Sequence, residues 1–205
     1  MRGAAKRLAE EGYARIPIVG VLALQGDFHA HVRLLRALGA EVREVRTPAG
    51  LPGLDGLVIP GGESTTMTLG IEREGLAEPL RELAAAGTPV LGTCAGMILL
   101  DRDHLGIADY RCARNAFGRQ IRSFEADLRM PGLDGPPVRA VFIRAPWIAE
   151  HGAGVEVLAS VDGHPVAARD GNLLVISFHP EIAGETRIHE LFLRDVAARA
   201  TAHAA

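Results

Sequence analysis

A cysteine in a glycine-framed turn is the first group in the sequence that could act as a nucleophile. Cys94 stands in the segment LGTCAG, residues 91–96, directly after an apolar run. Glycines two residues before and two after a nucleophile are typical of a sharp strand-to-helix elbow, where bulkier neighbours would clash. Such an elbow places the thiol at a helix N-terminus, where the dipole and the free amides favour a thiolate. Taken alone, a cysteine after a buried strand can also be an inert apolar residue.

A histidine and a carboxylate follow a second apolar run. His179 and Glu181 lie in SFHPE, residues 177–181, where Pro180 ends the run NLLVISF. We expect this segment at the same rim of the fold as Cys94, because both follow the ends of buried strands. A thiol nucleophile needs a base within hydrogen-bond reach, and the base needs a third group to fix its ring and tautomer. The three residues therefore predict a catalytic triad, although the histidine alone could be a surface residue beside a turn.

A glycine-rich loop supplies backbone amides to the same predicted rim. It is PGGESTT, residues 60–66, and it also follows an apolar strand. The glycines let the backbone approach a ligand, and Ser64 could cap the helix that follows. A tetrahedral intermediate needs two donors for its oxyanion, and the amides of Gly62 and Ala95 are the candidates. An ordinary glycine turn is the alternative, whereas a phosphate loop would need a lysine that is absent here.

The elements that must position these groups alternate between strands and helices. Short, continuous apolar runs rich in β-branched residues predict strands buried on both faces. Between the first two, apolar residues at helical spacing predict a helix that ends before Gly39. Alternation of this kind indicates a parallel sheet with helices on both faces and a ligand site beyond the carboxyl ends of its strands. We expect strands at 16–24, 41–45, 56–60 and 89–93, and helices at 27–38 and 77–86.

The second half of the chain has a different pattern. Beyond Gln120, apolar segments are separated by short polar or glycine turns, such as Val161-Asp162-Gly163, which predicts β-rich hairpins. A helix is expected over 185–199, followed by a frayed alanine-rich tail at 200–205. We expect one domain over 16–199, preceded by an extension at 1–15 that is disordered or reflects a misplaced start.

Composition limits the classes of function. The chain has 205 residues, a formal net charge of −3 and a mean hydropathy of +0.14. No apolar run approaches the roughly 20 residues that span a bilayer, and no signal sequence is apparent, so we expect a cytoplasmic protein. The absence of a basic cluster argues against nucleic acid or an anionic membrane as partner. Two cysteines, Cys94 and Cys112, cannot form a disulfide framework and are expected to be free thiols.

Six motifs together give the chain a family resemblance. PGGEST, GTCAG, RNAFGRQ, SFEADL, FIRAP and SFHPE are similar to segments of the glutaminase subunits of pyridoxal phosphate synthase, which are class I glutamine amidotransferases. The resemblance extends from about residue 18 to 192. It implies a flavodoxin-like, three-layer α/β fold with a mainly parallel central sheet and a β-rich C-terminal half. It also implies hydrolysis of L-glutamine to L-glutamate and ammonia without a cofactor or metal.

The resemblance assigns roles to residues of the matching motifs. It makes Cys94 the nucleophile, His179 the base and Glu181 the group that orients the base. A role close to the oxyanion is implied for Gln25, which follows the first strand. The implied contacts with L-glutamine are Gly62, Glu63, Ser64, Arg114, Ile143 and Arg144. An α-carboxylate and an α-ammonium group are suited to such a set of arginines and backbone groups.

The resemblance further implies a partner. The ammonia would pass to a pyridoxal 5'-phosphate synthase subunit within a large hetero-oligomer. One departure from the family is the stretch of residues 100–105, after the nucleophile helix, which is several residues shorter than is usual in the family. This difference leaves the shape of that loop and a contact with the partner open.

Three other functions fit parts of the sequence. A zinc deaminase fits the H-x-E element of SFHPE, but no cysteine pair follows Cys112 to complete its ligands. His29 and His31 could suggest a metal site, but residues two apart on a helix point in different directions, so both are expected at solvated positions. A binding protein with a redox-sensing cysteine and a cysteine hydrolase acting on γ-glutamyl conjugates both remain open, and only substrate assays separate the hydrolase from a glutaminase.

Overall fold

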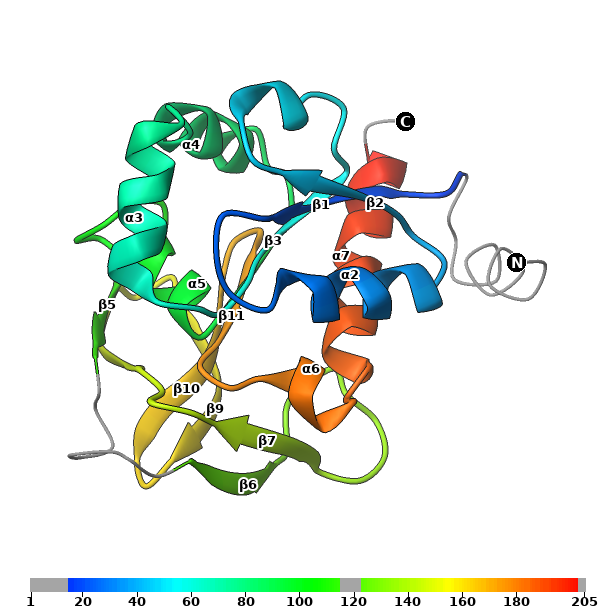
Figure 1. The fold of residues 1–205 in the computed structure, drawn as a ribbon. Helices are drawn as coiled ribbons and strands as arrows, with labels where there is room; N and C mark the ends of the chain where they lie inside the picture. Colours follow the sequence, from blue (N-terminus) through cyan, green and yellow to red (C-terminus); the bar gives the residue numbers. More distant parts are fainter. Residues whose placement is uncertain (1–14, 115–122, 203–205) are drawn as a thin grey trace.

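A seven-stranded sheet forms the centre of the molecule (Figure 1). The structure is a computed structural model and describes residues 15–114 and 123–202. In spatial order the strands are β2 (Glu41–Val45), β1 (Ile18–Leu22), β3 (Gly56–Ile59), β4 (Val90–Thr93), β11 (Leu173–Ile176), β10 (His164–Asp170) and β9 (Glu156–Val161). The first five are parallel to one another, β10 pairs antiparallel with β11, and β9 pairs antiparallel with β10. The predicted mainly parallel sheet is thus confirmed.

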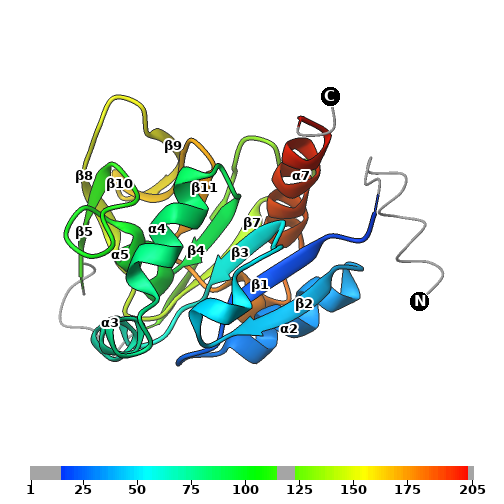
Figure 2. The ribbon, with the colours of Figure 1, turned by 90° about the horizontal axis from the view of Figure 1, so that it is seen from above.

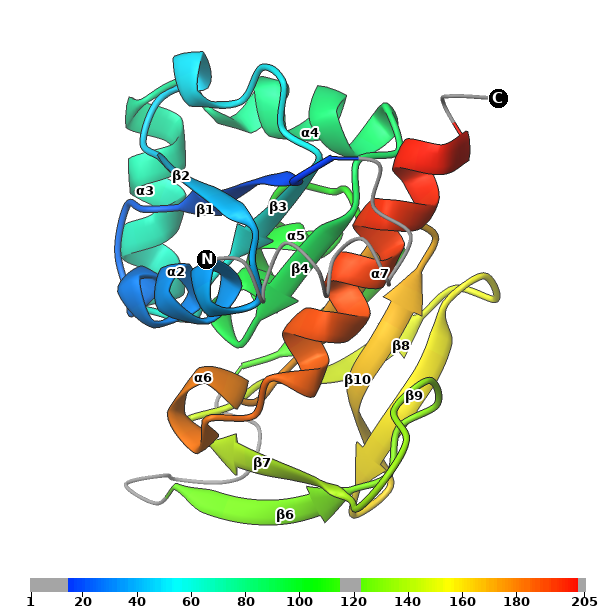
Figure 3. The same ribbon diagram turned by 90° about the vertical axis from the view of Figure 1, so that its right-hand side faces the viewer.

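Helices cover both faces of this sheet and make a three-layer fold (Figures 2 and 3). One face carries α2 and α7, onto which Figure 3 looks. The other face carries α3, α4 and α5. The helices are α2 (Phe28–Ala37), α3 (Ser64–Arg73), α4 (Ala77–Ala85), α5 (Ala95–Leu100), α6 (Pro180–Ala183) and α7 (Arg187–Ala202), with a 3-10 turn η1 (Pro48–Gly50). The last long helix begins two residues later and ends three residues later than expected. No helix of the described ranges is long and apolar enough to cross a membrane.

Alternation along the inner strands explains why their sequences are continuously apolar, unlike that of the edge strand β2. In β1, Val19 and Val21 pack into the core beneath α2 and α7, whereas Ile18 and Leu22 pack into the core beneath α3, α4 and α5. A strand with both faces covered has no position for a solvated side chain. The expected burial on both faces is therefore confirmed.

The second half of the chain adds antiparallel strands, as predicted. A hairpin turn at Asp162 and Gly163, both with positive φ, joins β9 to β10, and β10 pairs with β11. Two small sheets flank the central one: β5 (Tyr110–Ala113) with β8 (Trp147–His151), and β6 (Phe124–Leu128) with β7 (Val138–Phe142). The strand β11 is the last strand of the parallel part of the sheet and lies beside β4, which places the segment after β11 next to the segment after β4.

Candidate active site

The turn at Cys94 has the geometry of a strained elbow. Cys94 has φ 49° and ψ −106° and connects β4 to α5. A Cβ atom added to Gly96 would lie 1.9 Å from the carbonyl oxygen of Ile59, and one added to Gly92 would lie 2.8 Å from Leu100 Cδ1. Gly96 is therefore required by close approach to backbone, as the sequence predicts, whereas Gly92 is closely packed against a side chain that could move. A left-handed conformation at a non-glycine residue costs energy that the surrounding structure must offset, and such strain is concentrated at functional sites.

His179 and Glu181 lie at the same edge of the sheet, after β11. The Nδ1 atom of His179 is 2.7 Å from Oε1 of Glu181, and their side chains are 12% and 2% exposed. Two backbone hydrogen bonds hold this arrangement: the N–H of Cys94 donates to Ile176 at 2.8 Å, and the N–H of His179 donates to Val141 at 2.9 Å. The hydrogen bond from Cys94 to Ile176 of β11 places the predicted base beside the predicted nucleophile.

The pKa of His179 reflects two opposed effects. Burial by itself lowers the pKa, because it disfavours the charged ring. Hydrogen bonds to Cys94 and to Glu181, and the charges of those two groups, outweigh burial and raise the pKa of His179 to about 10. The ring is therefore an imidazolium at neutral pH, as expected of a histidine that shares its proton with a thiol and a carboxylate.

The glycine-rich loop packs against the triad and is held by the segment after β1. A Cβ atom on Gly61 would lie 2.6 Å from Cε1 of His179, so only glycine fits there. The backbone N–H of Glu63 donates to Gln25 Oε1 at 2.7 Å. Gly26, with φ +89°, leaves room for the Gly61 carbonyl oxygen, which would otherwise meet its Cβ at 1.8 Å. Gln25 and Gly26 thus determine where the amides of this loop lie.

The residue that caps α3 is Glu63, so the expectation of a Ser64 cap is wrong. The carboxylate of Glu63 accepts hydrogen bonds from Thr65 N and Thr66 N at 3.1 and 2.7 Å. The hydroxyl and backbone N–H of Thr66, followed by the N–H of Thr65, hold the pKa of Glu63 at about 2. A carboxylate at the first turn of a helix also interacts favourably with the dipole. Ser64 is the first residue of the helix and is 8% exposed.

One cavity of about 460 Å³ is lined by residues of the elbow, of the glycine-rich loop and of the segment after β11. This volume suits a small, polar ligand. Glu181 does not line it, because it lies behind His179. Two lining residues were not predicted from the sequence: Thr65, from α3, and Ile98, from α5. The predicted residues that line the cavity are Gln25, Gly62, Glu63, Ser64, Cys94, Ala95, Arg114, Ile143, Arg144 and His179.

The two arginines reach the cavity from exposed positions. Arg114 follows β5, and Arg144 follows β7 with φ 46°. The remainder of the RNAFGRQ motif after Arg114 lies outside the described residues. The carbonyl oxygen of Ile143 is 4.0 Å from Cys94 Sγ. Residues 143–144 therefore form the wall of the cavity beside the nucleophile.

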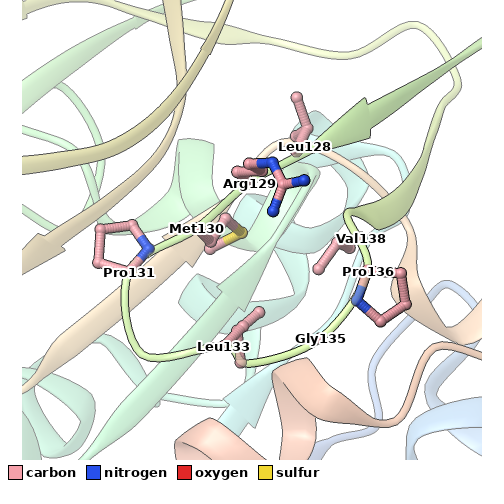
Figure 4. Close-up of a pocket in the computed structure, with 8 residues that line it drawn as sticks. All are labelled: Leu128, Arg129, Met130, Pro131, Leu133, Gly135, Pro136 and Val138. Atoms are coloured by element: carbon pink, nitrogen blue, oxygen red, sulfur yellow. The ribbon is translucent and has the colours of Figure 1, made fainter.

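A second cavity provides a comparison. It has about 360 Å³ and lies at the loop between β6 and β7 (Figure 4). Its lining is mostly apolar, with Arg129 as the single charged group, and it contains no nucleophile or base among the described residues. The groups that could perform acyl transfer lie at the cavity that holds Cys94.

The expectation that His31 is solvated is wrong, whereas His29 is exposed as expected. The side chain of His29 is 64% exposed, but His31 is 0% exposed and its Nε2 lies 3.6 Å from Glu181 Oε2. A second fully buried histidine, His189 of α7, lies beside it. His31 occupies the apolar stripe of α2 with Phe28, Val32 and Leu35, so helical spacing was a signal of its burial.

Comparisons with known proteins agree with this geometry. Residues 21–198 match the SNO glutamine amidotransferase family. The chain is 54% identical over 189 residues to the "Pyridoxal 5'-phosphate synthase subunit PdxT" of Parafrankia sp. (strain EAN1pec), which covers 88% of this chain and 93% of that protein. It is also 54% identical over 186 residues to the protein of the same name from Mycobacteroides abscessus (strain ATCC 19977), covering 86% and 96%.

Two solved structures are similar to this chain in fold. A crystal structure described as a glutamine amidotransferase matches with a TM-score of 0.81 at 44% identity and covers 87% of this chain and 98% of that one. The structure of PurLQS from Thermotoga maritima shares the fold with a TM-score of 0.67 at 18% identity, over 89% of this chain and 96% of that one. The chain belongs to the SNO glutamine amidotransferase family.

Proposed function

We propose that this chain hydrolyses L-glutamine to L-glutamate and ammonia through a thioester on Cys94, and that the ammonia serves pyridoxal 5'-phosphate synthesis. The observation that carries the proposal is the elbow at Cys94 beside the His179–Glu181 pair, at one wall of a polar cavity. The name shared by the relatives, which denotes part of a pyridoxal 5'-phosphate synthase, supports the second half of the proposal.

The first half-reaction is attack by the thiolate of Cys94 on the side-chain amide carbon of glutamine. The C–S bond forms and the carbonyl π electrons move onto oxygen, giving a tetrahedral oxyanion. The imidazolium of His179 then donates its proton to the departing nitrogen. The C–N bond breaks, ammonia leaves and a γ-glutamyl thioester remains.

The second half-reaction hydrolyses the thioester. The neutral ring of His179 takes a proton from water as its oxygen attacks the thioester carbon. The second oxyanion collapses, glutamate leaves and the thiolate is regenerated opposite an imidazolium. Glu181 accepts from Nδ1 of the ring throughout, which fixes the tautomer that leaves Nε2 for the reacting atoms.

The oxyanion of both half-reactions would be held by the amides of Gly62 and Ala95. Ala95 is the first residue of α5, where the N–H groups have no partner within the helix. Each donor of this kind contributes about 2.7–4 kcal/mol to lowering the barrier. Because one site serves both oxyanions, no rearrangement is needed between the two steps.

The amino-acid head of glutamine would lie among Glu63, Ser64, Arg114 and residues 143–144. Arg114 and Arg144 line the cavity, and a guanidinium group is suited to pair with the α-carboxylate. Backbone groups of the glycine-rich loop and of Ile143 suit the α-ammonium and the side-chain amide. The partner that uses the ammonia would be the synthase, assembled with this chain in a hetero-oligomer.

The test is to compare Cys94→Ala with Cys112→Ala. Cys94→Ala should lower glutamine hydrolysis by at least about 10⁴-fold, as loss of a nucleophile does in other triads. Cys112→Ala is the matched control, because burial, with Asp101 and Cys94 adding to it, raises the pKa of that thiol far above its ordinary value and leaves it unreactive. Glutamate release is measured with the cognate synthase present. Substantial activity in Cys94→Ala would exclude the proposal.

A further inference from the structure

Two histidines form a fully buried pair behind the triad. His31 of α2 and His189 of α7 are both 0% exposed, and His31 Nδ1 lies 2.9 Å from His189 Nε2. They are 158 residues apart in the chain. Burying two imidazoles costs free energy unless their polar atoms find partners. The pair has no part in the reaction steps above, so its position needs an explanation.

The second ring nitrogen of His31, Nε2, faces the triad. His31 Nε2 lies 3.4 Å from Thr93 Oγ1, next to the nucleophile in the chain, and 3.6 Å from Glu181 Oε2. Glu181 Oε2 is buried and has no hydrogen-bond partner of its own among the described residues. The oxygen that does not bind His179 therefore faces His31 in a region without solvent.

The negative charge of Glu181 favours one assignment of protons to the ring nitrogens of the pair, and the hydroxyl of Thr93, which can donate or accept, is compatible with it. An ionised carboxylate only accepts hydrogen bonds, so the favourable arrangement places a proton on His31 Nε2. The Nδ1 atom of His31 must then accept, and His189 Nε2 must donate to it. This arrangement leaves His189 Nδ1 as a bare lone pair, and that atom is buried without a partner in the described part of the chain. With the protons on the other two nitrogens, an N–H at His189 Nδ1 would be buried without an acceptor. The lone pair of His31 Nε2 would then face the carboxylate of Glu181.

Burial favours neutral rings in the pair. Burial lowers the pKa of His31 to about 3, with the carboxylate of Glu181 opposing and the nearby His189 and His179 adding to the effect. Burial lowers the pKa of His189 to about 4. The ionisable groups that act on this region are His31 from α2, His189 from α7, and His179 and Glu181 from the segment after β11. The pair thus acts through its N–H dipoles rather than through a positive charge.

We propose that His31, oriented by His189, is a positioning residue that holds Glu181 so that its other oxygen accepts from His179. This inference rests on the proposed function. At 3.6 Å the contact is a dipole facing a charge rather than a full hydrogen bond, but such a dipole is effective where water is excluded. The pair restricts rotation of the carboxylate and thereby the ring that serves Cys94.

The first experiment separates a hydrogen-bond donor from a packing residue. His31→Gln keeps an N–H close to the position of Nε2, whereas His31→Leu has a similar volume and no donor. Glutamine hydrolysis is measured with the cognate synthase, with His29→Leu, an exposed position of the same helix, as control. We expect His31→Leu to lower kcat by on the order of 10- to 100-fold with KM changed less than about twofold, the loss seen when outer partners of functional histidines are removed.

Comparing His31→Leu, His31→Gln and His29→Leu tests whether His31 acts as a hydrogen-bond donor. We expect His31→Gln to retain most of kcat and His29→Leu to match the wild type. In His31→Leu the pKa of His179, followed by NMR, should fall, because its carboxylate partner is less well held. Equal kcat in the leucine and glutamine variants, or an unchanged pKa of His179 in His31→Leu, would overturn the positioning role.

The second experiment needs no variant and no activity. NMR of the full chain with ¹⁵N-labelled histidine reports which nitrogen of His31 carries the proton. We expect the Nε2–H form across neutral pH; a proton on Nδ1 alone, or titration of His31 near its ordinary pKa, would overturn the inference. If Cys94→Ala retained activity, the proposed function would fail whatever the tautomer. If Cys94→Ala is inactive and His31→Leu is fully active, only the positioning role fails.

Discussion

At the scale of single residues, the site depends on two groups, one with a strained backbone conformation and one that stays protonated although it is buried. Cys94 has a left-handed backbone, and His179 is mostly buried yet keeps its proton. The close packing of the flanking glycines stabilises the backbone conformation of Cys94. The side chains of Cys94 and Glu181 stabilise the proton on His179. Groups with perturbed pKa values in a cavity are typical of catalytic sites.

The pKa of His179 predicts how stability depends on pH. The pKa is about 10 in the folded chain against an ordinary value of 6.5, so the folded state binds the proton more tightly. The resulting stabilisation is fully present below pH 6.5 and is lost as the pH rises through 10. We expect the difference in free energy of unfolding between the wild type and His179→Gln to narrow over this interval. Urea unfolding at several pH values measures it, and a difference that does not change with pH would contradict the prediction.

The arginines at the cavity predict an effect on binding. Arg114→Ala and Arg144→Ala should each raise KM for glutamine by roughly 10- to 100-fold, because a charged hydrogen bond contributes about 1.5–3 kcal/mol. Turnover should change much less. Arg139→Ala is the control, since Arg139 lies on β7 outside the cavity and pairs with Glu125 at the surface. Wild-type kcat/KM in both cavity variants would remove these arginines from the site.

At the scale of elements, the geometry at Cys94 depends on how closely α5 and β3 approach. Gly96 lies in the first turn of α5 against the carbonyl oxygen of Ile59, the last residue of β3. No side chain fits between a helix and a strand at this distance, so glycine is needed for packing as well as for the turn. The same contact sets the distance between the nucleophile and the glycine-rich loop that follows β3.

Gly96→Ala should therefore destabilise the fold. Its Cβ would meet Ile59 O at 1.9 Å, and overpacking of this kind costs about 1–3 kcal/mol or more. In a chain of this size we expect the melting temperature to fall by roughly 2–10 °C. Gly154→Ala is the control, because nothing lies within 4 Å of its added Cβ. Equal melting temperatures of the two variants would show that the contact is not rigid.

At the scale of the whole molecule, the chemistry of ammonia favours a partner that completes the site. Ammonia released into water at pH 7 is mostly protonated and no longer nucleophilic, so hydrolysis uncoupled from an acceptor wastes glutamine. The peptide between Gly61 and Gly62 joins two glycines, whose backbone angles are the least restricted, but its carbonyl oxygen packs closely against Gly26, so a turn needs that contact to be released. Docking of the synthase could therefore align an amide with the oxyanion.

We expect the isolated chain to be a poor glutaminase that its synthase partner activates. One additional oxyanion donor is worth about 10²–10³ in kcat, so activation should appear mainly in turnover. The experiment titrates the purified chain with the cognate synthase and follows glutamate formation. Full activity in the free chain, unchanged at saturating partner, would exclude this form of regulation.

The sequence by itself determined the parts of the protein whose chemistry is local. The apolar strands, the elbow around Cys94 and the His-Pro-Glu segment each carry their signal within a few residues, since backbone strain, burial and ring orientation depend on near neighbours. The mainly parallel sheet follows from their alternation with helices. Their roles in catalysis stay predictions until the variants are measured.

Only the tertiary structure decided the contacts between distant segments. The position of β11 beside β4 brings His179 to Cys94, and the packing of α2 against α7 brings His31 to His189. Local pattern could not predict either, because a strand's partner and a buried polar group's partner depend on which surfaces meet. The cap of α3 is a smaller case: serine is the commoner capping residue, but the backbone turns one residue earlier and Glu63 takes the position.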